Sequence, residues 1–196
     1  MEDLQQQSLE QPQASVEEKV NWKQFVWDLF ETIVLAVALY FGINAVSARV
    51  RVDGLSMTPT LKDGEFVLVN RLAYNFGAVE RGDIIVFHFP VDPKQELIKR
   101  VIGLPGDRIV ISNHQVSVNG HILNEPYIAR APDYNGEWLV PEHFLFVLGD
   151  NRNDSSDSHS WGMLPMDNVV GKAVLIYWPP GLWKVIQHAD LLAAAQ

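Results

Sequence analysis

A chain of 196 residues has room for one compact domain of about 150 residues and a further segment. Hydrophobic residues make up 47% of the sequence and charged residues 20%, proportions typical of a packed protein rather than a disordered one. The formal net charge of −9 without a Lys/Arg-rich run excludes a typical nucleic-acid-binding protein, and the lack of cysteine excludes disulfides and most thiol or zinc chemistry.

Residues 1–24 are rich in Gln and Glu and have almost no apolar clustering before Val20. Such a segment cannot bury enough apolar surface to offset the entropic cost of ordering it. We therefore predict a disordered tail over residues 1–24.

Residues 25–48 (FVWDLFETIVLAVALYFGINAVSA) form a long apolar segment. A helix of this length extends about 36 Å, enough to cross a bilayer. A core helix is seldom apolar on every face, and a cleavable signal begins nearer the N-terminus with a basic head. We therefore expect a transmembrane helix over 25–48. Positive charges are nearly balanced on its two sides, so they do not fix its orientation.

After residue 49 the sequence changes to short runs of β-branched and aromatic residues between turn-forming residues. These runs predict strands over 65–70, 83–89, 97–103, 108–112, 144–148 and 171–178. Residues 115–118 and 121–123 flank Asn119-Gly120, a pair that favours a type I′ hairpin. The expected fold is therefore one mainly β domain over 49–196 that follows the helix. Its C-terminal tail, 182–196, has helical periodicity.

Four polar segments follow the predicted span: 54–61 (GLSMTPTL), 81–87 (RGDIIVF), 99–107 (KRVIGLPGD) and 149–162 (GDNRNDSSDSHSWG). In this order they resemble the sequence boxes of type I signal peptidases, and the similarity extends to about Trp178. The resemblance implies a membrane-bound serine endopeptidase with a β-rich catalytic domain and a Ser–Lys dyad. Such enzymes remove N-terminal signal peptides from exported proteins after small-X-small sites, and no metal or organic cofactor is implied.

Ser56 lies in a turn-prone segment between Gly54 and Pro59. Taken alone, it is more simply a serine that caps a turn. The resemblance assigns it as the nucleophile, whose proton a neighbouring base must remove. Met57 is then expected to line the substrate groove. In some members a serine at the position of Gly54 contributes to the oxyanion hole, so here that hole would depend on the Ser56 N–H and another donor.

The resemblance assigns Lys99 as the base. His159 lies close to Asp157 in the sequence, but neighbours on one loop seldom form a catalytic triad. Free lysine has a pKa of about 10.4, so a basic amine must be desolvated. Lys99 lies in an apolar strand, and strand residues alternate, so we expect it to point inward and Arg100 to point into solvent. The alternative is a solvated Lys–Arg pair on an edge strand.

The loop 149–162 supplies the expected support. The resemblance implies that Ser155 forms a hydrogen bond with Lys99 and that Asp157 helps to organise the site. Asp150 and Arg152 are candidate ion-pair members. Some members carry arginine where this chain has His159, so the salt bridge with Asp157 is expected to be weaker or pH-dependent.

Other functions fit the sequence less well. The loop does not match the ligand spacing of an EF-hand. A decayed peptidase would have lost Ser56 or Lys99, and a self-cleaving repressor would carry a basic DNA-binding domain. The expected partners are preprotein signal peptides and the lipid bilayer, with no nucleic acid and an open oligomeric state. The resemblance places the enzyme in a cell or thylakoid membrane as a single-pass protein, with a cytoplasmic N-terminus and an extracytoplasmic catalytic domain.

Overall fold

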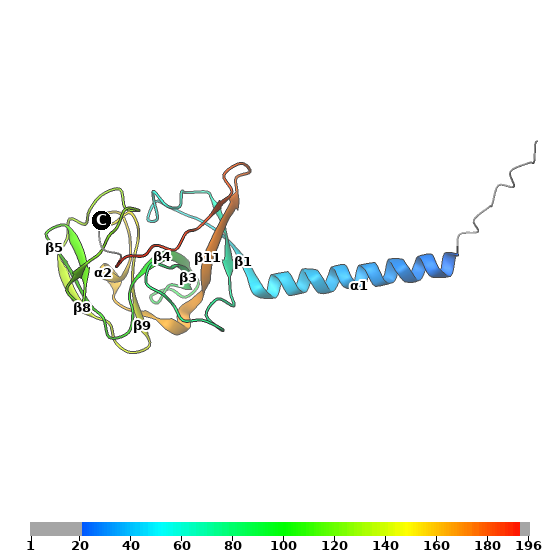
Figure 1. The fold of residues 1–196 in the computed structure, drawn as a ribbon, viewed down its shortest axis with the longest axis horizontal. Helices are drawn as coiled ribbons and strands as arrows, with labels where there is room; N and C mark the ends of the chain where they lie inside the picture. The colour runs from blue at the N-terminus through cyan, green and yellow to red at the C-terminus, as the bar shows by residue number, and fades with distance from the viewer. Residues whose placement is uncertain (1–20, 193–196) are drawn as a thin grey trace, which may run out of the picture. The chain divides into compact units, whose positions relative to one another are not determined.

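The structure, a computed structural model, describes residues 21–192 (Figure 1). It is rich in β-strands and has one long N-terminal helix, so the predicted fold class is confirmed. The chain divides into two compact units, residues 1–41 and 42–196. Most of the predicted tail, residues 1–20, lies outside the described residues, as do residues 193–196 at the C-terminal end.

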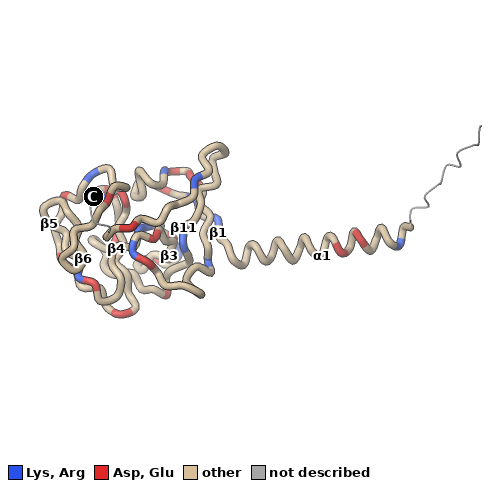
Figure 2. Tube along the Cα trace, viewed as in Figure 1, with Lys and Arg blue, Asp and Glu red and all other residues tan. Residues whose placement is uncertain are grey.

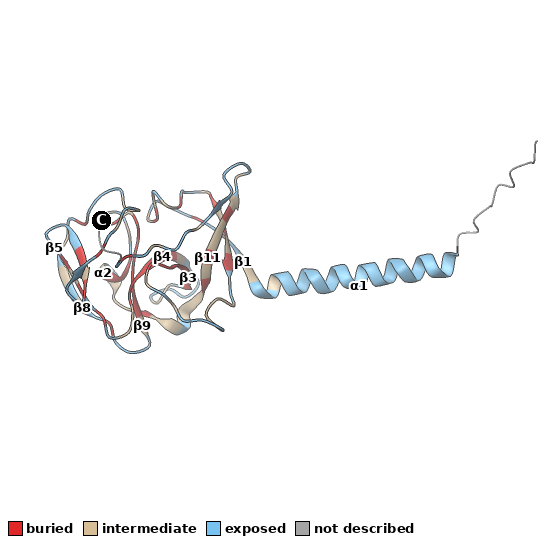
Figure 3. Cartoon of the chain, viewed as in Figure 1, coloured by how far each residue is buried: buried red, intermediate tan, exposed pale blue. Residues whose placement is uncertain are grey.

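Helix α1 (Trp22–Val46) has 25 residues, none of them buried, and Figure 3 shows it exposed along its length. Its charges, Lys23, Asp28 and Glu31, lie in its first half (Figure 2). Mean hydropathy reaches 1.9, and within residues 21–192 it is the one helix long and apolar enough to cross a membrane. A helix that exposes apolar side chains on every face is suited to lipid rather than water.

The helix begins and ends earlier than the predicted span of 25–48. It starts at Trp22, inside the segment predicted to be a disordered tail, and ends at Val46. Ser47 and Ala48 belong instead to strand β1 (Ser47–Arg51), where they pair with Asn70 and Val69. The hydrogen bonds of this ladder, which the apolar pattern does not reveal, end the helix two residues early.

A large antiparallel sheet carries most of the second unit, in the order β1-β2-β11-β3-β4-β9-β10, with β12 paired to β11. The bounds after β1 are β2 (Phe66–Asn70), β3 (Ile84–His88), β4 (Glu96–Gly103), β9 (Phe144–Leu148), β10 (Leu164–Pro165), β11 (Val169–Trp178) and β12 (Lys184–Val185). Two short helices, α2 (Ser158–Trp161) and η1 (Met166–Asn168), lie between β9 and β11. Each of the six strands predicted from 65–178 overlaps a strand of the structure.

A smaller sheet has the order β7-β6-β5-β8. Its strands are β5 (Arg108–Ser112), β6 (Gln115–Val118), β7 (His121–Ile122) and β8 (Gly136–Leu139). Within the second unit, which begins at Gly42, β5 and β8 lie at the end opposite to β1 and β11 (Figure 1). Asn119 and Gly120 have φ angles of 53° and 84°, the positive values that a type I′ turn requires, so the predicted hairpin is confirmed.

The helical periodicity predicted for 182–196 is wrong over the described part of that tail. Residues 184–185 form β12, and the segment up to residue 192 contains no helix. Backbone bonds hold it extended: Ile186 N–H donates to the Val174 carbonyl, and the Leu191 carbonyl accepts from Asn124 N–H. Leu191 is 2% exposed and packs in an apolar cluster with residues of β5, β6 and β9. These distant contacts replace the local helical hydrogen bonds.

Candidate active site

Ser56 lies in a tight turn that leaves β1. Thr58 N–H donates to the Leu55 carbonyl, and Leu61 N–H donates to the Met57 carbonyl. Gly54, with a φ of 92°, begins the turn in a conformation that favours glycine, and its N–H donates to Asp63 Oδ1 over 2.7 Å. The turn therefore holds the Ser56 side chain in a fixed position at the end of a strand.

Lys99, from β4, meets this turn. Its Nζ lies 2.8 Å from Ser56 Oγ, and it also donates to the Ile98 carbonyl over 3.0 Å. The two residues are 43 positions apart in the sequence. The structure thus brings the two predicted dyad residues into direct hydrogen-bond contact.

The Lys99 amine is removed from water. The residue is 3% exposed, and burial lowers the pKa of Lys99 to about 8, while the carboxylates of Asp157 and Asp150 act in the opposite direction. Among the described residues no carboxylate lies within salt-bridge distance of the amine. An ammonium without a paired anion is costly in such a place, so the neutral amine becomes accessible near neutral pH.

A narrow cleft of about 70 Å³ opens beside the dyad. It lies between residues 50–53 and 96–99, and Ser56, Met57 and Lys99 line it. Met57 does line the cleft, as expected, although it is almost fully buried and also packs in the core. Strand β3 pairs with one edge of β4 over residues 96–100. On the other edge β9 pairs with β4 only from Arg100 onward, so among the described residues no strand pairs with 96–99 along that edge.

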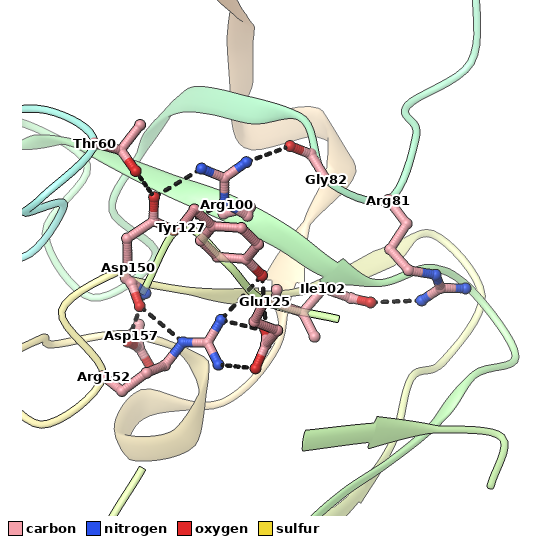
Figure 4. Close-up of polar contacts among 11 residues, drawn as sticks. Thr60, Arg81, Gly82, Arg100, Ile102, Glu125, Tyr127, Asp150, Arg152 and Asp157 are labelled. Carbon is pink, nitrogen blue, oxygen red and sulfur yellow. Dashed lines mark hydrogen bonds and ion pairs between the residues drawn. The ribbon is translucent and has the colours of Figure 1, made fainter. Parts of the chain in front are cut away.

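Arg100 alternates to the face of β4 opposite Lys99, but it is not solvated as expected, since it is only 1% exposed. Its guanidinium forms two hydrogen bonds to Asp150, Nε to Oδ1 over 2.8 Å and Nη2 to Oδ2 over 2.7 Å (Figure 4). A third bond runs from Nη1 to the Gly82 carbonyl over 2.9 Å, and the Tyr127 ring packs 3.9 Å from the guanidinium carbon. Other parts of the chain cover both faces of β4. The alternation of side chains along the strand therefore does not expose Arg100 to solvent.

Arg152 forms a second buried pair, with Glu125 (Figure 4). Its Nη1 and Nη2 atoms lie 2.7 and 2.6 Å from the two carboxylate oxygens, and Nη2 also donates to Tyr127 Oη over 3.2 Å. Asp150 and Arg152 are therefore ion-pair members as predicted, but each pairs with a distant residue. Glu125, Tyr127 and Arg100 were missed, because no local pattern reveals a partner 25 or more positions away.

The loop at 149–157 also contacts the Ser56 turn directly. Asp150 accepts a hydrogen bond from Thr60 Oγ1, and Asn151 N–H donates to the Ser56 carbonyl over 3.0 Å. A Cβ on Gly149 would clash with that carbonyl and with the Ser155 hydroxyl, so this close approach requires glycine. The loop at 149–157 and the Ser56 turn are thus packed directly against each other.

Asp157 is fully buried at the N-terminus of α2. Its Oδ2 accepts from Gly149 N–H over 2.9 Å, and its Oδ1 lies 2.6 Å from His159 Nδ1. Oδ1 also accepts from His159 N–H, which caps the helix. The expected contact between Asp157 and His159 is present.

Ser155 does not form the hydrogen bond with Lys99 that we expected. Its hydroxyl is buried beside Gly149 and has no hydrogen-bond partner among the described residues. The Lys99 amine is occupied instead by Ser56 and the Ile98 carbonyl. An unpartnered buried hydroxyl costs about 1–3 kcal/mol, so it is a notable feature beside a reactive pair.

No cofactor is expected, and the residues near the dyad offer no cluster of metal ligands. Elsewhere in residues 21–192, Glu80, Asp83 and His188 lie close enough together to contact one ion. Lys172 Nζ already lies 2.6 Å from Asp83 Oδ1, so an ammonium occupies the position where a cation would bind. This cluster is therefore a structural ion pair rather than a metal site.

Known proteins are similar over most of the chain. The family model described as signal peptidase, peptidase S26, matches residues 26–178. Signal peptidase I of Leptolyngbya laminosa is 44% identical over 158 residues, covering 76% of this chain and 78% of that protein. Signal peptidase I of Bacillus caldolyticus is 37% identical, with coverages of 80% and 91%. The probable thylakoidal processing peptidase 2, chloroplastic, of Arabidopsis thaliana is 35% identical, covering 80% of this chain and 44% of that protein.

Proposed function

Because the chain belongs to the signal peptidase family, peptidase S26, we propose that it cleaves preproteins with Ser56 as nucleophile and Lys99 as general base. Membership makes it a serine peptidase that removes signal peptides. The observation that carries the assignment of residues is the 2.8 Å contact between Lys99 Nζ and Ser56 Oγ, made by a buried amine.

The proposed reaction begins with the neutral amine. Its lone pair accepts the Ser56 hydroxyl proton while Oγ attacks the carbonyl carbon of the scissile bond. The resulting ammonium gives this proton to the leaving amine as the C–N bond breaks, which leaves an acyl-enzyme on Ser56. Lys99 then takes a proton from water as the water oxygen attacks the ester carbonyl. When the C–Oγ bond breaks, the lysine ammonium returns this proton to Ser56 Oγ, which restores the hydroxyl and the neutral amine and releases the signal peptide with a free carboxyl group.

The developing negative charge on the carbonyl oxygen needs a hydrogen-bond donor. The Ser56 N–H is a suitable group, because within residues 21–192 no oxygen accepts it. Gly54 N–H is bound to Asp63, so it is not free to serve. Loss of one such donor typically lowers the rate about 10²- to 10³-fold, so this amide is central to the proposed mechanism.

Substrate would bind as an added extended strand in the cleft between residues 50–53 and 96–99. The unpaired edge of β4 supplies backbone groups for such pairing. The cleft volume of about 70 Å³ supports the selection of small side chains such as Ala, one and three positions before the cut. This preference rests on the family resemblance together with that volume.

Ser155 and Asp157 act as supporting residues in this proposal. Once Lys99 holds the transferred proton, its ammonium has three N–H donors, and the Ile98 carbonyl satisfies only one. The buried, unpartnered hydroxyl of Ser155 is available to accept another. Asp157 holds the loop through Gly149 N–H and stabilises the charged lysine at longer range.

The chain would act as a single-pass membrane protein. We assign α1 as the span, with the N-terminus cytoplasmic and the catalytic unit on the other side of a cell or thylakoid membrane. Protease added outside sealed cells should then digest the chain beyond Arg51 and spare its first 20 residues. Protection of the catalytic unit would reverse this orientation.

The central experiment is incubation of the detergent-solubilised enzyme with a preprotein carrying an Ala-X-Ala site. Mass spectrometry of the product should place the cut directly after the second Ala, and Ser56→Ala should give no product. A Ser56→Ala enzyme that still cleaves would refute the assignment of the nucleophile.

A further inference from the structure

His159 is tied to the catalytic lysine through one buried carboxylate. Its Nδ1 lies 2.6 Å from Asp157 Oδ1, and the Asp157 side chain is fully buried. Asp157 is also the larger of two carboxylate influences on Lys99. One anion is thus shared between an imidazole, a side chain that can gain a charge, and an amine that must lose its charge to act.

The imidazole is held firmly but remains open to solvent. Its ring stacks on Tyr134 with centroids 4.1 Å apart and an angle of 17° between the planes. The His159 side chain is 24% exposed, so protons can reach it. Burial raises the pKa of Tyr134 above its usual value, so the phenol carries no charge beside the imidazole.

The other charged groups around this cluster do not replace His159 as partner of Asp157. Arg152 is paired with Glu125 and Arg100 with Asp150, and Asp133 is an exposed residue next to Tyr134. Lys99 itself bonds to Ser56 and the Ile98 carbonyl. Among the described residues, His159 is therefore the one basic side chain within salt-bridge distance of Asp157.

We propose that His159 is a positioning residue that acts on Lys99 through Asp157 and extends the activity of the enzyme to lower pH. When the imidazole is protonated, it neutralises the field of the Asp157 carboxylate at the amine. Lys99 then loses its proton more readily, so a larger fraction is neutral at a given acidic pH. When the imidazole is neutral, the carboxylate stabilises the ammonium and this gain disappears.

This inference rests on the proposed role of Lys99 as the base. The test compares kcat/KM between pH 5.5 and 9.5 for wild type, His159→Gln and His159→Arg, with His121→Gln as the matched control on exposed β7. His159→Gln should equal wild type near pH 9.5 and be roughly tenfold slower at pH 5.5, the effect of about one unit in the pKa of Lys99. His159→Arg, a permanent cation, should restore the rate at pH 5.5.

A uniform loss of rate at every pH in His159→Gln, or a profile that coincides with wild type, would refute the proposal. A second measurement avoids reliance on turnover. NMR titration of lysine-labelled full-length protein in detergent, with Lys99 assigned from Lys99→Ala, should give a lower Lys99 pKa in His159→Arg, which keeps its charge at every pH, than in His159→Gln. Equal Lys99 pKa values in these two variants refute the coupling, whereas activity that survives in Lys99→Ala refutes the assignment of the base instead.

Discussion

The two faces of strand β4 hold neighbouring cations in opposite electrostatic settings. Arg100 is buried with a carboxylate bound through two hydrogen bonds and an aromatic ring over its plane. Lys99 is also buried, but among residues 21–192 its amine forms hydrogen bonds only with a hydroxyl and a carbonyl. Guanidinium cannot lose its proton at working pH, whereas a desolvated amine can.

This difference separates structural support from chemistry. On the Arg100 side each guanidinium nitrogen donates a hydrogen bond and the charge is permanent, so this face links β4 to the loop at 149–157. On the Lys99 side no carboxylate of the described residues pairs with the amine, so the neutral form, which can accept a proton, is favoured. The pKa of Lys99, the proposed base, depends on the exclusion of water and on the distance to each carboxylate. The surrounding structure must therefore hold these groups in place.

The largest expected effect comes from removal of the base. Lys99→Ala should lower kcat/KM by a factor on the order of 10⁴ or more, and the double variant with Ser56→Ala should be no slower, because the two residues act as a unit. Lys99→Arg should be equally inactive, since arginine keeps its proton. Circular dichroism should show intact folds, and a Lys99→Arg enzyme with near-normal turnover would contradict the comparison between the two faces.

Breaking the pair on the opposite face should reduce the stability of the fold. Asp150→Asn leaves Arg100 buried without its anion, which should lower the free energy of unfolding by about 3–5 kcal/mol. Chemical denaturation of the catalytic unit measures this loss. Asp154→Asn, the same change at an exposed position of the same loop, should have little effect. Equal stability of the two variants would show that the Arg100 pair does not hold the loop.

A smaller effect is expected at the unpartnered hydroxyl. Ser155→Ala removes the acceptor proposed for the lysine ammonium, which should slow cleavage roughly ten- to a hundredfold. Ser156→Ala, at the exposed neighbouring position, should behave as wild type in the same assay. If the two variants are alike, Ser155 does not contact Lys99 during the reaction.

The last prediction concerns the dependence of kcat/KM on pH, which requires no substitution. Because burial lowers the pKa of Lys99 to about 8, kcat/KM should rise with pH through this value and level off above it. Well below pH 8 the rate should fall as the amine becomes protonated, which stopped assays in a series of buffers can follow. An acid limb close to the pKa of free lysine, about 10.4, would show that Lys99 is not desolvated in the working enzyme.

Local patterns in the sequence determined the apolar helix, the strands predicted between 65 and 178 and the hairpin at Asn119-Gly120. Each depends on residues within a few positions of one another, through periodicity or through the φ angles that a turn requires. The resemblance of four short segments pointed to Ser56 and Lys99, and the structure places these two side chains in contact.

Only the tertiary structure decided what lies next to each polar side chain. The sequence suggested a solvated Arg100 and a helical tail, and both expectations failed because a partner or covering element comes from far along the chain. The bond that the resemblance implied between Ser155 and Lys99 is absent from the structure, where the Ser155 hydroxyl has no partner among the described residues. Glu125 and Asp150 are 27 and 50 positions from the arginines they bind. Burial and ion pairing are set by packing across the whole domain, and so no local pattern could supply them.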